Sequence, residues 1–481
     1  MLFASASFIF LFLPLSLAAF YLTPKRHRRQ ILLIISVLFY ILANLSSPLS
    51  IAVMAAAVTA TYFTGMLISP GRSIRCPGQT QADGRRGSAA VLIATVAALA
   101  ILVALRIVNH SGMGTGYFPL GAAVWLLHCV SYLTDIARGD VQSDSPWDAL
   151  LYLTYFPLMV VGPVVRYKVF VRCAGQSEYN VNCAAEGMRM FAVGFIERIA
   201  VAAVLVDAYE KITDNASSSM NYVLGLCAAA LIFVTSFFAL VGWSDMARGL
   251  SMMFGIRLPD DFGSALTACT PSDYFSCVFR GLGEWYCDYI KDPLFAALGH
   301  SEAGRAVEAV GLGCGVLWLA VWLKCSPAML LVGLAAGALV ALLELSGADG
   351  FVRRHRWLWP VGWIVTFLVA SVFWTGGVVG SVSELGKMAR AISVHSTDYN
   401  IFYIYIEMSG GRYIVSALVA LLMVPLYRRY RQVSSLLPRG LRNVYDGLRT
   451  IVILGLFAFS LIFFMPQYPE YAVQAFKYFI F

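Results

Sequence analysis

Long apolar runs separated by short polar segments follow one another along the whole chain. A helix needs roughly 20 residues to cross a bilayer, and we expect about eleven or twelve segments to cross it or to enter it deeply. They are drawn from thirteen candidate stretches, at residues 2–21, 31–45, 50–68, 89–107, 122–133, 150–165, 190–206, 222–240, 306–323, 327–345, 357–375, 413–426 and 451–466. Several are short or carry charge, so we expect some to be tilted or re-entrant. The pattern predicts an all-α integral membrane protein.

The composition strengthens this prediction. Of the 481 residues, 59% are hydrophobic and only 13% are charged, and the mean hydropathy is +0.73. A soluble domain of this composition would have too few polar side chains to cover its surface. The first apolar run has no basic residue before it and is followed by a basic segment at residues 25–29. We therefore expect a membrane segment there and not a signal peptide.

The net charge of +8 is concentrated in loops at residues 25–29, 72–86, 353–356 and 428–449. Basic loops normally stay in the cytoplasm. The first two loops are separated by two crossings, so they agree on one side and place the N-terminus outside. The charges are too thinly spread beside apolar spans for a nucleic-acid partner. We expect them to contact the headgroups of the lipid bilayer.

Ten cysteines are spread along the chain, and none forms a C-x₂-C pair. We therefore expect neither a metal site nor a disulfide framework. Buried, inert thiols are the default interpretation.

Four segments form a recognisable set. Residues 242–262 read GWSDMARGLSMMFGIRLPDDF, and residues 275–294 read FSCVFRGLGEWYCDYIKDPL. Earlier in the chain, an S-Y-x-x-D-x-x-R-G pattern is filled by Ser131, Tyr132, Asp135, Arg138 and Gly139. An F-P-x-x-x-x-G-P-x-x-R-Y pattern includes Gly162, Pro163, Arg166 and Tyr167. Together these segments resemble the membrane-bound O-acyltransferase family, and in particular its alginate O-acetylation branch, over nearly the whole chain.

The resemblance implies a single domain over residues 1–481, built as a ring of tilted helices around a central funnel that enters from both faces. Family members move an acyl group from a cytoplasmic thioester of coenzyme A or an acyl-carrier protein toward an acceptor outside. No tightly bound cofactor is expected. In the alginate branch the acceptor is an exported polysaccharide, and a separate extracytoplasmic transferase is common. The resemblance thus implies a multi-pass protein of the bacterial inner membrane, with such a transferase or a polysaccharide synthase as its partner.

The chain departs from the family at two histidines. The family pattern R-W-H-x-S-x-x-x-W-x-x-D-Y, counted back from Trp285 and Asp288, places the first histidine at Phe279. A later L-W-H-G pattern places the second at Leu323. Imidazole suits deprotonation of a hydroxyl because its pKa lies near the working pH, and neither replacement accepts a proton. We expect both side chains to pack the pore wall and the usual mechanism to be altered or lost.

A further departure follows Gly194. The family element there usually continues with two basic residues and an aspartate, whereas this chain has Glu197, Arg198 and Ala203.

Two residues are candidates for a substitute base. On a helix, Arg280, Glu284 and Asp288 share one polar stripe because they are four residues apart. Either Arg280 and Glu284 form an ion pair inside the helix bundle, or the stripe lines a polar channel and Glu284 serves as the base. His128 lies in an apolar segment beside Cys129. It is either a hydrogen-bonded core residue or a second substitute base.

Other residues are candidates for the funnel lining. Ser244 and Asp245 either cap a helix that starts after them or line the pore. Lys324, next to Trp322, either reaches the membrane interface or holds a phosphopantetheine phosphate. The complete set of expected lining residues is Arg280, Glu284, Asp288, Trp285, Ser244, Asp245, Trp322, Lys324, Arg166 and Tyr167.

Three hypotheses for function follow. The first is a variant of the acyltransferase fold that serves acylation of an exported polysaccharide or cell-envelope polymer. Acetylation is the form of acylation we expect, and the chain's own catalysis is altered or lost. The second is an active O-acyltransferase that uses Glu284 or His128. The third is a non-enzymatic scaffold or lipid-handling subunit of a synthase complex.

Overall fold

The computed structural model describes residues 3–45, 48–68, 121–141, 145–160, 162–177, 179–215, 222–297, 304–379, 381–393, 411–423 and 438–468. Within these ranges the chain forms helices and no strand, which confirms the all-α prediction. The predicted segment at residues 89–107 and the basic loop at 72–86 lie outside the described residues. The part of the basic loop at residues 428–449 that precedes Pro438 also lies outside them.

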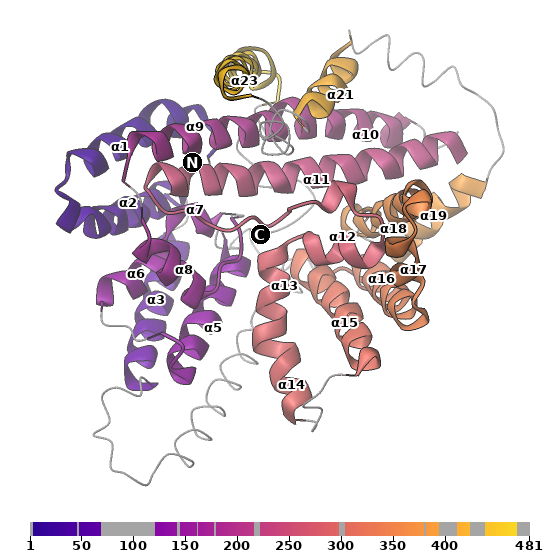
Figure 1. Cartoon of the computed structure of the whole chain (residues 1–481), viewed down its shortest axis with the longest axis horizontal. Helices are drawn as coiled ribbons and strands as arrows, with labels where there is room; N and C mark the ends of the chain where they lie inside the picture. The colour runs from indigo at the N-terminus through magenta and orange to yellow at the C-terminus, as the bar shows by residue number, and fades with distance from the viewer. Residues whose placement is uncertain are drawn as a thin grey trace.

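The first half of the chain forms a group of helices at one end of the molecule (Figure 1). They are η1 (Phe8–Phe12), α1 (Leu13–Leu22), η2 (Lys25–His27), α2 (Arg28–Ala43), α3 (Pro48–Ile68), α5 (Ala122–Arg138), α6 (Pro146–Thr154), α7 (Phe156–Met159) and α8 (Tyr167–Gly175). The segment predicted at 150–165 is not one continuous helix. It is interrupted at Tyr155, two residues before Pro157, a residue that has no N–H to continue a helical ladder.

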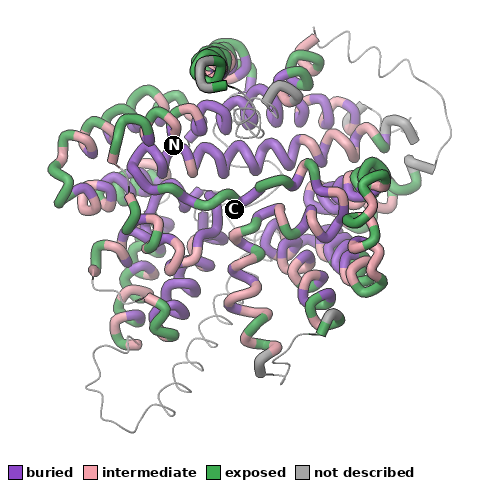
Figure 2. The backbone as a smooth tube through the Cα atoms, viewed as in Figure 1, coloured by how far each residue is buried: buried purple, intermediate pink, exposed green. Residues whose placement is uncertain are grey.

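Two long helical runs lie side by side along the upper part of Figure 1. One consists of the consecutive elements α9 (Val181–Ile196), η3 (Glu197–Ala203) and α10 (Val204–Asn215), and the other is the 32-residue α11 (Tyr222–Met253). Figure 2 shows that α9 and α11 are buried along most of their length. η3, a π-helix, contains the divergent Glu197 and Arg198, both fully buried.

Glycines bring α9 and α11 into backbone contact. A Cβ atom on Gly194 would lie 2.5 Å from the carbonyl oxygen of Gly242, and one on Gly187 would lie 2.6 Å from that of Gly249. The two glycines of each helix are seven residues apart, so they share one face after two turns. Any larger side chain at these positions would force the helices apart.

The second half of the chain forms a group at the other end (Figure 1). Its elements are η4 (Ala265–Thr267), α12 (Pro271–Cys277), α13 (Arg280–Tyr286), η5 (Cys287–Lys291), α14 (Asp292–Ala297), α15 (Arg305–Leu323), α16 (Pro327–Ser346), α17 (Ala348–Arg354), η6 (Arg356–Leu358), α18 (Trp359–Val378) and α19 (Val382–Ser393). Along the top of Figure 1 lie α21 (Arg412–Met423) and α23 (Arg439–Phe459), which continues into η8 (Ser460–Phe464).

Six helical stretches of the described residues are long and apolar enough to cross a membrane. They are Pro48–Ile68, Gly225–Met253, Ala306–Leu323, Pro327–Ser346, Arg356–Val378 and Leu441–Phe464. Phe8–Leu22 is a shorter apolar helix. The expected total of about eleven or twelve segments, and their arrangement as a ring around a funnel, stay predictions.

Candidate functional site

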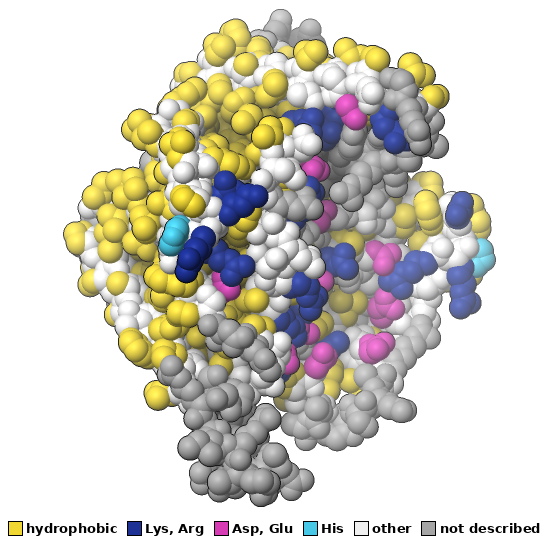
Figure 3. Space-filling model, turned by 60° about the vertical axis from the view of Figure 1, so that its left-hand side comes forward, with side chains coloured by type: hydrophobic (Ala, Val, Ile, Leu, Met, Phe, Trp, Pro, Cys, Tyr) yellow, Lys and Arg dark blue, Asp and Glu magenta, His cyan; other side chains and the backbone are white. Residues whose placement is uncertain are grey.

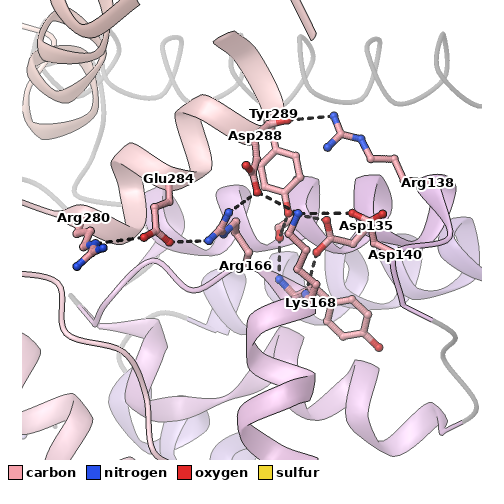
Figure 4. Close-up of polar contacts among 11 residues, drawn as sticks. Asp135, Arg138, Asp140, Arg166, Lys168, Arg280, Glu284, Asp288 and Tyr289 are labelled. Carbon is pink, nitrogen blue, oxygen red and sulfur yellow. Dashed lines mark hydrogen bonds and ion pairs between the residues drawn. The ribbon is translucent and has the colours of Figure 1, made fainter. Parts of the chain in front are cut away.

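Three motifs that are distant in sequence meet between the two groups of helices. α5 supplies the S-Y-x-x-D-x-x-R-G side chains, the start of α8 supplies those of the G-P-x-x-R-Y pattern, and α13 with η5 supplies those of W-x-x-D-Y. Figure 4 shows their polar contacts. The residues that the resemblance singled out therefore form one structural unit.

Hydrogen bonds inside this unit tie α5, α8 and η5 together. The hydroxyl of Tyr289 donates to Oδ1 of the buried Asp135 over 2.6 Å, so Ser131 Oγ, 2.8 Å away, donates to Tyr289. Ser131 Oγ in turn accepts the Tyr167 N–H over 2.8 Å, and the Lys168 N–H donates to Asp135 Oδ2 over 2.8 Å. Both oxygens of the buried carboxyl are thus satisfied, as burial requires.

Ion pairs continue the unit toward solvent. The guanidinium of Arg166 pairs with Glu284 over 2.5 Å and with Asp288. Lys168 Nζ lies 3.0 Å from Asp288 and 3.5 Å from Asp140. Burial acts to raise the pKa of Asp288, but Lys168 and Arg166 outweigh it and hold the pKa below its usual value. Asp288 is therefore a carboxylate at neutral pH.

The predicted pair of Arg280 and Glu284 is present, with Nε 3.2 Å from Oε1. Its expected position inside the bundle is wrong, because the side chains are 65% and 43% exposed. Both face a cavity, and Arg166 holds the other carboxylate oxygen of Glu284. An exposed pair of this kind contributes only about 0–1 kcal/mol.

The cavity has a volume of about 470 Å³ and lies between α12, α13 with η5, and α15. Arg166, Arg280, Glu284, Asp288, Lys291 and Glu308 contribute its charged lining. Phe279, Leu282, Leu312, Val316, Trp318 and Leu319 contribute much of its apolar lining. In Figure 3 charged side chains gather across the middle of a surface that is otherwise largely hydrophobic.

Phe279 lines this cavity and immediately precedes α13. Its φ of 51° makes it the one residue other than glycine with a positive φ among the described residues. The side chain is 2% exposed, and its ring lies 4.9 Å from that of Phe262 and 5.2 Å from that of Trp322. Left-handed backbone costs an ordinary residue roughly 1–2 kcal/mol, so aromatic packing has to offset strain here.

Leu323 does not join Phe279 at the cavity. It is fully buried at the end of α15 and is absent from the lining, whereas Trp318 and Leu319, one turn earlier, line it. Of the two replaced positions, only Phe279 therefore lines this cavity, and their shared place in a pore wall stays a prediction.

Four of the ten expected lining residues line the cavity: Arg166, Arg280, Glu284 and Asp288. Trp285 is buried behind them, donating to Leu127 O over 3.0 Å and stacking on Trp318 at 5.8 Å. Tyr167 is also fully buried, with its ring 5.0 Å from that of Tyr132.

The expected roles of Ser244, Asp245 and Lys324 need correction. Ser244 and Asp245 lie inside the continuous helix α11, where no open helix end needs a cap, and Asp245 pairs with Arg248 over 2.9 Å. Lys324 Nζ donates to the carbonyl oxygen of Gly377 over 2.9 Å. It thus binds the C-terminal end of α18, where a cation is favoured, and does not line the cavity.

His128 is a core residue. It is 1% exposed, its ring lies 5.0 Å from that of Tyr152, and it does not line the cavity.

Asp261, in the loop after α11, was missed by the sequence analysis. Its Oδ1 accepts the Gly281 N–H over 2.8 Å, and its backbone oxygen accepts the Arg280 N–H over 2.8 Å. Burial raises the pKa of Asp261 to about 7, although the Gly281 N–H acts in the opposite direction. The acidic pair of the LPDDF segment, flanked by Pro259 and Phe262, was the available signal.

No group of three or more His, Cys, Asp or Glu side chains is arranged to hold a metal ion in the described part of the chain.

Comparisons of the sequence with known proteins identify a family and several similar proteins. The sequence profile of the membrane-bound O-acyltransferase family matches residues 88–281. Probable alginate O-acetylase AlgI of Pseudomonas putida is 25% identical over 393 residues, which cover 78% of this chain and 76% of that protein. Peptidoglycan O-acetyltransferase of Helicobacter pylori is 21% identical over 235 residues, 47% of this chain and 43% of that one. Teichoic acid D-alanyltransferase of Bacillus subtilis is 21% identical over 262 residues, covering 53% and 65%.

Proposed function

Because this chain belongs to the membrane-bound O-acyltransferase family, on its alginate O-acetylation branch, we propose that it serves acylation of an exported polysaccharide or cell-envelope polymer. Acetyl is the group we expect first, since similar proteins are named for O-acetylation. We further propose that the chain's own catalysis is altered or lost.

Phe279 carries the second part of this proposal. The resemblance assigns the general base to the two histidine positions, now Phe279 and Leu323, and the aromatic ring of Phe279, the one that lines the cavity, cannot accept a proton. It lies buried between Phe262 and Trp322, so a water molecule cannot simply take its place. Loss of a general base typically lowers the rate by 10²–10⁴.

Glu284 favours the second candidate function, an active enzyme with a relocated base, because it lines the cavity. Its ion pairs argue against that role. Arg166 holds Oε2 and Arg280 holds Oε1, so both oxygens already accept hydrogen bonds. A base must reach the hydroxyl proton directly or through one water, and His128 lies outside the cavity lining altogether.

The proposal includes a donor, a partner and a location. The donor is an acyl thioester of coenzyme A or a carrier protein, and the partner is an extracytoplasmic transferase or a polysaccharide synthase. The location is the bacterial inner membrane with the N-terminus outside, as the basic loop at residues 25–29 predicts.

The experiment measures acyl transfer from acetyl and longer acyl thioesters by the full chain, with and without its native partner. We expect no transfer above background by the chain alone, and transfer with the partner that stops when the partner is inactivated. Glu284→Gln and His128→Ala are assayed beside the exposed control Arg354→Gln. Robust turnover by the chain alone that either of the first two variants abolishes would establish a relocated base and overturn the loss of catalysis.

A further inference from the structure

A second cavity, of about 360 Å³, lies at the turn between α1 and α2 and shares no lining residue with the first. Its lining includes Lys25 and Arg26 from the turn, Arg29 at the start of α2, Ser145 and Trp147 at the start of α6, and Tyr179 after α8. We call this cavity the basic pocket.

The basic pocket has more cations than carboxylates to balance them. Arg29 is paired with Asp148, with Nη1 2.7 Å from Oδ2. Lys25 and Arg26 are exposed, and no described carboxylate lies within ion-pair distance of either. The pocket is therefore open to an anion from outside the chain.

Arg28 adds a buried cation directly behind the pocket. It is 8% exposed, and its guanidinium lies 5.0 Å from the ring of Tyr179 and 5.3 Å from that of Phe20. Its Nε donates to Thr23 O over 3.3 Å, while Nη1 has no hydrogen-bond partner among the described residues. A buried charge without a counter-charge is costly. An anion bound in the pocket, which Tyr179 also lines, would offset that cost.

The surface beside the pocket is suited to lipid chains. On α1, Leu15 is 62% and Leu22 85% exposed, and on α2 Ile34 is 59% exposed. Trp147, in the pocket lining, is 44% exposed, and tryptophan is enriched where membrane and water meet. Figure 3 shows Lys and Arg side chains beside a His on this side of the molecule, within a mainly hydrophobic surface.

We propose that the basic pocket binds the phosphate-bearing headgroup of an anionic membrane phospholipid, whose acyl chains lie along the outer faces of α1 and α2. Basic pockets between membrane helices bind such headgroups. The adjoining apolar faces favour a lipid over free phosphate. Free phosphate has the same anionic chemistry but no acyl chains to cover these faces. They also favour it over an acidic carrier protein, whose surface would remain in water.

The test compares lipid retention in nanodiscs made from equal amounts of phosphatidylglycerol and phosphatidylcholine. The full chain is released from the nanodiscs, and the lipids that stay bound are counted by native mass spectrometry. We expect the wild type to retain phosphatidylglycerol preferentially. Lys25→Gln/Arg26→Gln should reduce that preference by roughly thirtyfold, about fivefold for each charge removed at a membrane surface.

Arg354→Gln/Arg356→Gln is the matched control, because it removes two exposed charges from another basic loop. It should lose less phosphatidylglycerol than Lys25→Gln/Arg26→Gln, because neither Arg354 nor Arg356 lines the basic pocket. Equal loss in both double variants would mean that net charge alone attracts the lipid and would overturn the site. Saturable displacement of phosphatidylglycerol by millimolar inorganic phosphate would support the phosphate chemistry but assign the pocket to a soluble anion.

A third arm separates the lipid from a protein partner. If an acyl-carrier protein bound the wild type but not Lys25→Gln/Arg26→Gln, and no lipid preference were found, the pocket would be a protein-docking surface and the lipid proposal would fail. None of these measurements depends on acyl transfer, so their outcome is independent of the proposed function.

Discussion

At Phe279 the backbone is left-handed although the side chain is a buried aromatic. Asp261 sets this conformation, because it accepts hydrogen bonds from the N–H groups of Arg280 and Gly281, the two residues after Phe279. These bonds fix where α13 begins. Two opposing contributions therefore meet at one residue. Ring packing stabilises it, and its φ destabilises it, which makes the position open to a direct test.

We expect Phe279→Gly to be more stable than Phe279→Ala, the reverse of the usual order in helical proteins. Both variants lose the ring, at about 3–5 kcal/mol, but only glycine adopts a positive φ without cost, a difference of about 1 kcal/mol. Thermal unfolding of the purified proteins measures this order. Phe275, buried inside α12, is the control, and there the alanine variant should be the more stable.

Asp261 should make stability depend on pH. The folded-state pKa is about 7 against an ordinary value of 3.8, so the unfolded chain releases the proton first as the pH rises. Stability contributed by the protonated acid is therefore lost between about pH 4 and pH 7, in total on the order of 4 kcal/mol.

Asparagine resembles the protonated acid, so Asp261→Asn should match the wild type at pH 4 and have the higher melting temperature at pH 8. Melting curves across this range measure the difference. Asp260 is a half-exposed neighbour that pairs with Arg248. Asp260→Asn should therefore lose stability between pH 4 and pH 7 as the wild type does. A wild-type curve that rises from pH 4 to pH 7 would contradict the assignment.

Among the elements, α9 and α11 form a close pair, because glycines take the place of larger side chains at their crossing. The apolar pattern predicts such helices but not their separation, since Gly187 and Gly249 are 62 positions apart in the chain. Sequence patterns predicted the structure better for features that lie within a single helix. The runs at 327–345 and 357–375 closely match α16 and α18, and the four-residue spacing of Arg280 and Glu284 predicted a pair that the structure contains.

Gly194→Ala should destabilise the protein by roughly 1–3 kcal/mol, because its methyl group would overlap the carbonyl of Gly242 and overpacked helices must separate. Gly455→Ala, in α23, is the matched control, since no atom lies within 4 Å of a Cβ built there. It should be neutral or slightly stabilising. Differential scanning fluorimetry in detergent compares the two, and equal melting temperatures would refute the close contact.

In the whole molecule, the network around Asp135 joins the two groups of helices. Its side chains could be predicted as members of motifs, but their partners could not. Arg166 and Asp288 are separated by 122 residues and Asp135 and Tyr289 by 154, and no local period links positions that far apart. The buried position predicted for Arg280 failed for the same reason, since the cavity beside it is formed by α15.

Tyr289→Phe should cost about 1–3 kcal/mol, because it leaves Oδ1 of the buried Asp135 without its donor. Tyr286→Phe, three residues earlier, removes a 3.2 Å hydrogen bond to the neutral carbonyl of Gly311 and should cost about 0.5–1.5 kcal/mol. Chemical denaturation of both variants measures the difference. A smaller loss for Tyr289→Phe than for Tyr286→Phe would show that the network does not hold the two groups together.

The sequence separation between Asp135 and Tyr289 also affects when the site can form during protein synthesis. Ribosomes add roughly 5–20 residues per second, so the tyrosine is synthesised roughly 8–30 s after its partner. During that interval Asp135 lacks the donor that its buried carboxyl group has in the folded protein. Nascent chains halted before residue 289 should therefore remain exposed to membrane quality control, and the cavity cannot be complete before η5 and α15 have been synthesised.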